Sequence, residues 1–557
     1  MTRTSTGRTA ALLGLAALPV GVLTVFFVLP VAGMLERGFW PDGGFDPGAV
    51  LDVLARPRVH RVLWFTLWSS TVATVLAVVL GLPAAYALYR PRFPLRGLVR
   101  GLLLVPFVLP TVVVGVAFRQ LLRDGGPLGV LGLDGTPAGI VTALVFFNVA
   151  VVIRTVGSAW EGLDRRPAEA AAALGASPVT VFRTVTLPAL RPAVVSAASV
   201  VFLFCATAFG VVLTLGGTRY SSVETEIYLL TTDLLDLPAA AALSIVQLVV
   251  VVGLLLVAGR ARRVPDPTVA RHASAARPRG VRRGDVPALV ATGLLLVAVA
   301  TPIVTLVLGS LRDDRGWTLR FYRALAGDGA TDPAGGGATL VAPVTEALGN
   351  SLRVAVDATW MSLLLGTLVA VVVTRRSRSR AERRLRGVLD GFFMLPLGVS
   401  AVTLGFGFLI TLDEPPLDLR DSALLVPIAQ ALVALPLVVR TLVPVLNGID
   451  DRQRQAAASL GAGALRSLAT VDLPVVWKPL LAAAGFAFAV SLGEFGATSF
   501  LAREDHPTLP IVIFRLIGRP GDLSYGTALA ASVVLAATTA LVLLAVERLR
   551  VPALGSW

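Results

Sequence analysis

The chain has 557 residues, of which 55% are hydrophobic and 15% are charged, and its mean hydropathy is +0.79. Soluble domains contain about a quarter charged residues, so this composition excludes an ordinary soluble protein and predicts a polytopic membrane protein. The net charge of +14 does not indicate binding to nucleic acid, because the arginines lie in short loops beside apolar segments, where they set orientation in the membrane.

Twelve apolar segments are long enough to cross about 30 Å of hydrocarbon as helices. In chain order they cover 10–34, 61–89, 101–122, 138–157, 191–215 and 237–259, then 287–310, 347–374, 388–411, 422–442, 478–502 and 523–547. We expect the first to be retained rather than cleaved as a signal peptide, because no small-residue cleavage site is evident. The predicted fold class is all-α, with two tandem, parallel repeats of six transmembrane helices.

The distribution of arginine predicts the orientation of the spans. Arginines are concentrated in the loops 90–100 and 375–386 and in the linker 260–286. By the positive-inside rule these loops and both termini lie in the cytoplasm, and the chain is a multi-pass membrane protein. The opposite loops are often acidic, with Glu224, Glu226, Asp233 and Asp236 in one and Asp413, Glu414, Asp418 and Asp421 in another.

One stretch of sequence occurs twice. Residues 162–188 read GLDRRPAEAAAALGASPVTVFRTVTLP, and residues 448–474 read GIDDRQRQAAASLGAGALRSLATVDLP. Gly175 and Gly461 are 286 residues apart, and weaker matches at similar spacing extend over most of each half. The chain is therefore predicted to be a tandem duplication with a first transmembrane domain at 1–259, a flexible Arg- and Pro-rich linker at 260–286, and a second transmembrane domain at 287–557.

Each copy has the sequence of a short helix-turn-helix. Asp164 and Asp450 are placed to cap an alanine-rich helix, and Gly175 and Gly461 are placed to end it in the left-handed conformation. A helix lying on lipid is the alternative, but an alanine face is too small to anchor well. We therefore predict a helix-turn-helix on the membrane surface that a partner protein can approach closely.

The duplicated stretch resembles the EAA loop of binding-protein-dependent ABC importer permeases of type I. The first copy matches the motif at Glu169, Ala170, Ala171, Gly175, Val185, Leu187 and Pro188, and the second at Ala456, Ala457, Gly461, Val471, Leu473 and Pro474, with Gln455 in place of the glutamate. The resemblance implies that each loop is a coupling helix for one of two copies of an ATP-binding subunit. It also implies an extracytoplasmic solute-binding protein and a location in the bacterial cell membrane. Because Gln455 is uncharged, the second loop is not expected to make the same charge contact as Glu169 in the first loop.

Other short motifs resemble the thiamine-type permeases within this family. They are Leu213–Gly217, Thr225–Tyr228, Ser491–Gly496 and Thr508–Pro510. The ferric-iron permeases share much of this pattern. The resemblance therefore implies thiamine or its phosphates as substrate, and ferric iron as the next candidate.

Two acidic residues within predicted spans are candidates for the translocation path. Glu494 lies in the span 478–502, where an ionised carboxylate costs roughly 2.5–3.5 kcal/mol, so it is expected to face the bundle interior. It either contacts a cationic substrate or pairs with an arginine such as Arg353. The matching position in the first half is Ala208, so the path is not symmetric there. Asp357, in the span 347–374, is the second candidate.

The chain is expected to have no catalytic site, metal site or cofactor of its own. Lys478 is the only lysine, and no glycine-rich loop precedes it, so ATP and magnesium would be bound by a partner subunit. Cys205 is the only cysteine. A membrane-embedded enzyme would need a cluster of His, Asp or Glu at catalytic spacing, and none is visible. A proton-coupled transporter of the six-plus-six type remains the alternative, although its repeated motif would lie between spans two and three of each half.

Overall fold

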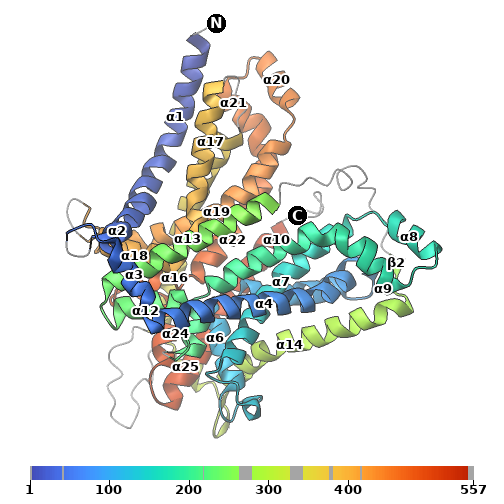
Figure 1. The fold of residues 1–557 in the computed structure, drawn as a ribbon, viewed down its shortest axis with the longest axis vertical. Coiled ribbons are helices and arrows are strands. Elements are labelled where there is room, and N and C mark those ends of the chain that lie inside the picture. Colours follow the sequence, from blue (N-terminus) through green and yellow to red (C-terminus); the bar gives the residue numbers. More distant parts are fainter. Residues whose placement is uncertain are drawn as a thin grey trace. The chain divides into compact units, whose positions relative to one another are not determined.

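Residues 3–40, 43–217, 219–261, 279–326, 343–374, 380–413 and 417–549 are described by a computed structural model (Figure 1). In this part of the chain the only strands are β1 and β2, which pair in parallel, and β3 and β4, which form an antiparallel pair. Each of the four strands has two residues. The prediction of an all-α membrane protein is confirmed.

The first repeat contains, in chain order, α1 (Arg3–Leu23), the π-helical turn η1 (Thr24–Val28), α2 (Leu29–Phe39), α3 (Pro47–Ala55), α4 (Pro57–Tyr89), β1 (Pro91–Arg92), α5 (Arg96–Leu104), the 3₁₀ turn η2 (Val105–Val108), α6 (Thr111–Leu122), the 3₁₀ turn η3 (Gly129–Leu131), α7 (Pro137–Glu161), α8 (Arg166–Ala173), α9 (Pro178–Val181), the π-helical turn η4 (Phe182–Thr186), α10 (Leu187–Ala206), α11 (Gly210–Gly216), α12 (Val223–Thr232) and α13 (Leu237–Ala261).

The linker end and the second repeat contain β2 (Arg279–Gly280), the 3₁₀ turn η5 (Arg283–Asp285), α14 (Val286–Ser310), β3 (Arg312–Asp313), β4 (Gly316–Trp317), α15 (Arg320–Ala324), α16 (Val344–Thr374), α17 (Arg380–Met394), the 3₁₀ turn η6 (Leu395–Gly398), α18 (Ala401–Thr411), α19 (Leu425–Gly448), α20 (Asp451–Ser459), α21 (Ala464–Ser467), the π-helical turn η7 (Leu468–Asp472), α22 (Leu473–Leu492), α23 (Thr498–Leu501), α24 (Leu509–Ile517) and α25 (Asp522–Leu549).

Ten helices in the described residues are long and apolar enough to span a membrane, and a bent pair could provide an eleventh span. The structure differs from the predicted straight helices at 101–122 and 388–411. The first of these is α5, η2 and α6, with a bend of 103°. The second is α17, η6 and α18. Pro106 and Pro396 lie in the two 3₁₀ turns, where proline cannot donate the hydrogen bond that a continuous helix needs.

Two other predicted spans, 191–215 and 478–502, end early. α10 stops at Ala206 and α22 stops at Leu492, and each is followed by a non-helical break before α11 and α23. Glu494 therefore lies in a break between two helices rather than within a continuous span. On the other side, both helices continue through a π-helical turn into the duplicated loops.

The chain forms two compact units, which do not follow the boundary between the repeats. Unit 1 comprises 1–53, 227–248 and 320–553, and unit 2 comprises 54–226, 249–319 and 554–557. In unit 2, α4, α7 and α10 pack together, and in unit 1 the equivalent helices α16, α19 and α22 do the same. The boundaries predicted at 259 and 287 refer to the sequence repeats, and the compact units have different boundaries.

The first long helix of each repeat lies in the unit built mainly by the other repeat. In unit 1, α1 packs against α16 and α2 packs against α18, whereas in unit 2, α14 packs against α4 and α6. Gly407 of α18 explains the close approach of α2, since a Cβ atom there would lie 2.9 Å from the Pro30 Cβ atom. Small residues allow helices to approach closely where no hydrophobic force drives their association.

The end of the linker is attached to unit 2, while its residues 262–278 lie outside the described part of the chain. β2 pairs with β1, and the Tyr86 hydroxyl donates a hydrogen bond of 2.6 Å to Asp285. The other Asp285 oxygen accepts the Arg282 backbone N–H at 2.8 Å. Residues 279–285 are therefore held in place, although the sequence predicts a flexible tether across the whole of 260–286.

A glycine–valine contact recurs in both units. A Cβ atom at Gly81 would lie 2.8 Å from Val152 Cγ1, and one at Gly366 would lie 2.5 Å from Val438 Cγ1. These contacts join α4 to α7 and α16 to α19. Both valines are fully buried, so neither has space to move away.

We predict that Gly366→Leu lowers the stability of the protein by about 1–3 kcal/mol, because the larger side chain overpacks the interface of α16 and α19. Thermal unfolding in detergent would show a lower midpoint. Gly349→Leu in the same helix is the matched control, since Gly349 has open space around its Cβ position. An equal midpoint in the two variants would contradict this account of the packing.

Candidate functional site

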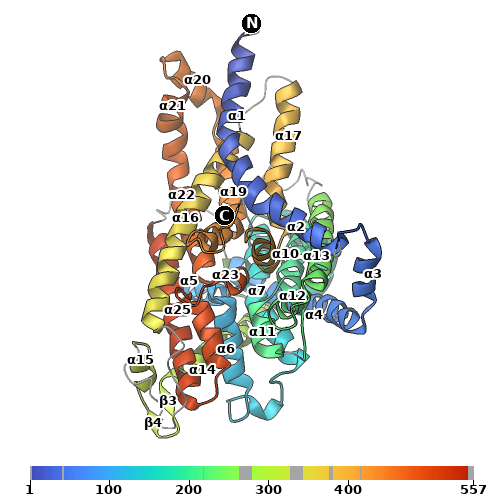
Figure 2. The ribbon, with the colours of Figure 1, turned by 90° about the vertical axis from the view of Figure 1, so that its left-hand side faces the viewer.

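The duplicated loops fold alike in the two repeats. α8 and α9 lie beyond the ends of α7 and α10 (Figure 1), and α20 and α21 lie beyond the end of α22 (Figure 2). Asp164 accepts the Arg166 backbone N–H at 3.0 Å, and Asp450 accepts the Arg452 backbone N–H at the same distance. The predicted helix-turn-helix is therefore present in both copies.

Glycine ends the first helix of each loop. Gly175 has a φ of +86° and Gly461 a φ of +83°, a conformation that residues with a Cβ atom rarely adopt. The next residue closes the turn, with Ala176 N–H donating to the Ala171 carbonyl at 3.1 Å. The second loop repeats this bond between Ala462 and Ala457 at 3.0 Å. Each loop thus ends its helix with a Schellman motif, in which glycine is strongly favoured.

Most motif residues face outward in both loops. Glu169 and Gln455 are exposed at equivalent positions, as are Ala170 and Ala456, whereas Ala171 and Ala457 are half-buried. The leucines before the two glycines, Leu174 and Leu460, are 89% and 88% exposed. Both leucine side chains are therefore accessible at equivalent positions of the two loops. The repetition of these leucines at the 286-residue spacing is visible in the sequence, but their exposure is shown only by the structure.

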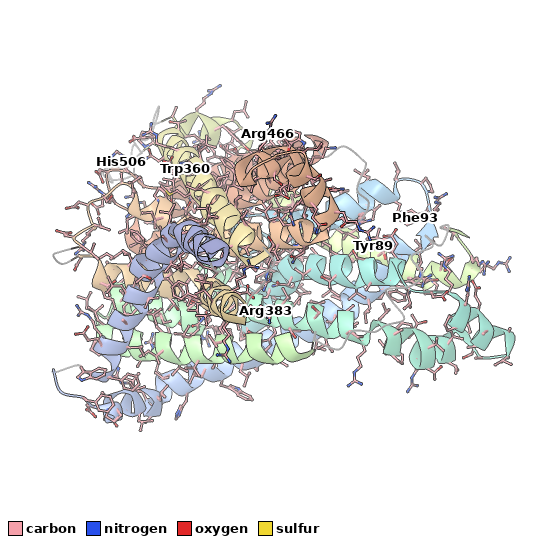
Figure 3. All side chains as sticks on the ribbon, turned by 90° about the horizontal axis from the view of Figure 1, so that it is seen from above. Tyr89, Phe93, Trp360, Arg383, Arg466 and His506 are labelled. Carbon is pink, nitrogen blue, oxygen red and sulfur yellow. The ribbon has the colours of Figure 1, made fainter. Side chains whose placement is uncertain are left out.

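Different contacts brace the two loops. In the second loop, Arg454 Nε lies 2.8 Å from Asp472 Oδ1, which ties α20 to η7. The matching positions in the first loop are Ala168 and Thr186, which cannot form an ion pair. Arg466 is exposed on α21 (Figure 3).

The first loop has aromatic and hydroxyl contacts instead. The Trp160 and Phe182 rings stack with centroids 6.0 Å apart. Ser177 accepts the Thr180 backbone N–H at 3.2 Å and caps α9. The matching position in the second loop is Gly463, which has no side chain to serve as a cap.

The Glu494 carboxylate is buried in unit 1 and is hydrogen-bonded by its own loop. Ala497 N–H donates to one oxygen at 2.8 Å, and Thr498 donates to the other from its N–H at 3.0 Å and its hydroxyl at 2.6 Å. Gln430 of α19 donates to the Thr498 hydroxyl oxygen at 3.2 Å. Arg353 is exposed, and no arginine among the described residues contacts Glu494. The expected alternative of an ion pair with Arg353 is not what the structure shows.

Asp357 lies on α16 and is half-buried. Its Oδ1 atom accepts a hydrogen bond of 3.2 Å from the Trp360 indole N–H, one turn along the same helix. Trp360 is half-exposed and is labelled in Figure 3. The structure does not bring Asp357 and Glu494 into direct contact.

The acidic residues expected in an outer loop at 224–226 are buried in α12 instead. The Glu226 side chain is 1% exposed and accepts hydrogen bonds from Arg58 Nε at 2.5 Å and Nη2 at 3.1 Å. Glu224 is also fully buried. Sequence alone could not show this, because its partner Arg58 lies in a different helix, at the start of α4.

A cavity of about 310 Å³ lies in unit 1 at the ends of α18, α19 and α23 that are remote from the duplicated loop. Phe408 and Phe500 form apolar parts of its wall, and Asp413, Asp421 and Glu504 are among its polar residues. Within the described part of the chain, no cluster of three or more His, Cys, Asp or Glu side chains could hold a metal ion.

The apolar helices and the two exposed loops define a membrane-embedded transport subunit. The chain belongs to the family of binding-protein-dependent transport system inner membrane components, which matches residues 77–266 and 362–550. The sequence resemblance to ABC importer permeases of the fused two-half type is thereby confirmed. Both matched ranges begin within α4 and α16, so they leave out α1, α2 and α14, the helices that lie in the unit of the other repeat.

Similar proteins include the thiamine transport system permease protein ThiP of Brucella abortus (strain 2308), which is 29% identical over 539 residues, or 93% of each chain. ThiP of Escherichia coli (strain K12) is 27% identical over 510 residues, covering 89% of this chain and 90% of that protein. The molybdenum transport system permease protein ModB of Azotobacter vinelandii is 37% identical over 159 residues, covering 27% of this chain and 70% of that protein.

We predict that Asp472→Asn loosens the second loop only. A partly exposed ion pair contributes roughly 0.5–1 kcal/mol, so local opening of α20 should rise about two- to five-fold. Limited trypsin digestion would detect this opening as faster cleavage after Arg452 and Arg466. Thr186→Ala, at the matching position of the first loop, is the control. Unchanged cleavage in the Asp472 variant would show that the ion pair does not brace the loop.

Proposed function

We propose that this chain is the permease subunit of an ATP-driven importer of thiamine or its phosphates in the bacterial plasma membrane. The observation that carries this proposal is the pair of exposed loops, in each of which the first helix ends at a glycine with positive φ. The chain that carries them belongs to the importer permease family. The similarity to ThiP proteins over 93% of the chain supports thiamine ahead of ferric iron. The shorter match to ModB shows that related permeases serve other substrates.

Two copies of an ATP-binding subunit dock on the loops, one on each. The exposed alanine faces allow close approach, and Leu174 and Leu460 offer apolar anchors for a cleft in each subunit. Glu169 adds a charge at the first loop, whereas Gln455 offers only an amide at the second. The contact surface comprises Glu169, Ala170, Ala171, Gly175, Leu187 and Pro188 and, in the second loop, Gln455, Ala456, Ala457, Gly461, Leu473 and Pro474.

The loops are joined to the spans in a way that can transmit force. The helical segment from Pro178 to Ala206 is continuous through η4, and that from Ala464 to Leu492 is continuous through η7. A displacement of either loop therefore moves a whole span, and with it the break at 207–209 or 493–497. ATP binding and hydrolysis in the partner subunits would supply that displacement.

The opposite side of the membrane receives the substrate from an extracytoplasmic solute-binding protein. The duplicated loops define the cytoplasmic side, so both termini are cytoplasmic. The cavity of unit 1 lies at the far ends of α18 and α19, on the side from which the substrate would enter, and two of its four acidic side chains, Asp413 and Asp505, pair with Arg420 and Arg503 in its wall. Glu494 and Asp357 are proposed as acidic contacts along the path.

Reconstitution tests the energy source. Proteoliposomes containing this chain, its ATP-binding subunit and its solute-binding protein should accumulate labelled thiamine only with hydrolysable ATP. A protonophore should leave the uptake rate unchanged. Uptake that persists without ATP and is abolished by the protonophore would instead establish the proton-coupled alternative.

We predict that Gly175→Val and Gly461→Val uncouple ATP hydrolysis from transport, because valine does not tolerate the positive φ of the helix end. Substrate-stimulated ATPase activity and thiamine uptake should fall at least ten-fold, while membrane insertion is retained. Gly463→Ser is the matched control, since it introduces the residue of the first loop at a position without positive φ. Coupled transport at the normal rate in both valine variants would remove the docking hypothesis.

A further inference from the structure

The end of the linker and the segment after α4 form one structure in unit 2. β1 follows α4 directly, and β2 and η5 precede α14. The two strands pair in parallel, with Pro91 opposite Arg279 and Arg92 opposite Gly280. α4 and α14 also pack against each other, so the strand pair lies at the adjoining ends of two candidate membrane spans. Two arginine-rich segments that are far apart in the sequence are thereby brought together.

The arginines of these segments have different surroundings. Three contact the protein itself: Arg90 donates to the Leu163 carbonyl at 3.4 Å, Arg96 donates to the Pro91 carbonyl at 3.3 Å, and the Arg100 guanidinium lies 4.1 Å from the centroid of the Tyr89 ring. Arg92, Arg282 and Arg283, here termed the strand-pair arginines, are exposed instead. In the described part of the chain, none of the strand-pair arginines forms an ion pair with an acidic side chain.

The backbone holds the strand-pair arginines near one another. Neighbouring strands lie about 4.8 Å apart, and Arg282 is two residues beyond Gly280, the partner of Arg92. Asp285 fixes this end of the linker, because one of its oxygens accepts the Tyr86 hydroxyl at 2.6 Å and the other accepts the Arg282 N–H at 2.8 Å. Asp285 is itself 1% exposed, so it presents no negative charge at the surface beside the arginines.

Membrane orientation alone does not require this arrangement. The positive-inside rule depends on the number of basic residues in a loop and not on their mutual position. The second repeat has Val371 at the position that matches Tyr86, and valine cannot donate a hydrogen bond. On α17, the counterpart of α5, Arg383 and Arg384 are exposed, and the described part of unit 1 contains no strand. The two groups of arginines therefore differ in whether a strand pair fixes them.

Exposed apolar side chains continue from the strand-pair arginines along α14. Four of them, each between 49% and 67% exposed, share one face of the helix at spacings of four, four and three residues: Val286, Val290, Leu294 and Val297. On α5, which packs against α14, Leu98 and Leu102 are exposed at a spacing of four. α14 is long and apolar enough to span the membrane, so lipid chains cover its exposed face. Arginines at the end of such a face lie at the level of the lipid headgroups.

The chemistry of these two adjoining surfaces defines one ligand. Arginine binds phosphate oxygens through paired N–H donors, and basic clusters next to a membrane span bind anionic headgroups. A free anion would use the arginines but not the apolar face. A soluble protein does not fit either, because the surface continues into a face that lipid covers.

We propose that Arg92, Arg282 and Arg283 bind the phosphate of an anionic phospholipid, whose acyl chains lie along the exposed face of α14. Arg90 connects this segment to Leu163, so the lipid lies on the same side of the membrane as the first duplicated loop. This inference goes beyond the proposed function and does not depend on which substrate is transported.

Native mass spectrometry of the full chain in detergent tests the site. The protein is titrated with phosphatidylglycerol, which is anionic, and in parallel with phosphatidylcholine, which has no net charge. Each basic residue at a lipid surface contributes about five-fold in affinity, so Arg92→Gln with Arg282→Gln should weaken phosphatidylglycerol binding about twenty-fold. Binding of phosphatidylcholine should not change. Lysine at both positions keeps the charge and should restore most of the preference for the anionic lipid.

Arg383→Gln with Arg384→Gln is the matched control, because it removes two exposed arginines from α17; Arg383 is labelled in Figure 3. This control should keep the preference for phosphatidylglycerol. An equal loss in both double variants would overturn the proposal, since any surface arginine would then attract the lipid. Unchanged binding in the Arg92 and Arg282 variant would overturn it too. Displacement of the bound lipid by millimolar inorganic phosphate would show a site for a free anion and would also refute the lipid.

Tyr86→Phe tests whether the strand pair positions the arginines. It leaves every arginine in place and removes the hydrogen bond that holds Asp285. Phosphatidylglycerol binding should weaken about two- to five-fold, with phosphatidylcholine binding unchanged, because the linker end is held less firmly. A preference equal to that of the wild type would overturn the inference that the strand pair builds the site.

Discussion

The architecture depends on one constraint: hydrocarbon offers no hydrogen bonds to the backbone, so every interruption of a membrane helix must be satisfied from within the protein. This chain interrupts its helices at several places. Proline removes the donor in η2 and η6. At 493–497 the Glu494 carboxylate accepts the N–H groups that begin α23.

The same constraint connects the two candidate sites. The duplicated loops project beyond the spans, where water can satisfy the backbone, and there glycine ends each helix with its own backbone bonds. The breaks lie at the other ends of the same continuous helices, in buried surroundings. In each repeat one continuous helix therefore joins an exposed loop to a break within the compact unit, and in the second repeat that break holds Glu494.

The two repeats share the same helix packing but differ in the polarity of side chains at some matching positions. The helix contacts of α4, α7 and α10 recur in α16, α19 and α22, and the glycine–valine contact recurs with them. The braces of the loops and the residues of the breaks do not recur. Packing tolerates little change of volume, which accounts for the recurrence of the helix contacts.

The sequence by itself determined the helical class, the duplication and the outward loops, because apolar length, repeat spacing and capping residues are local properties. It also located Glu494 and its asymmetric counterpart Ala208. Only the tertiary structure decided that Glu494 is bonded by Thr498 and not by Arg353, that Glu226 is paired with Arg58, and that α1, α2 and α14 belong to the unit of the other repeat. These contacts join residues far apart in the chain, and neither spacing nor propensity specifies which distant surface a helix will meet.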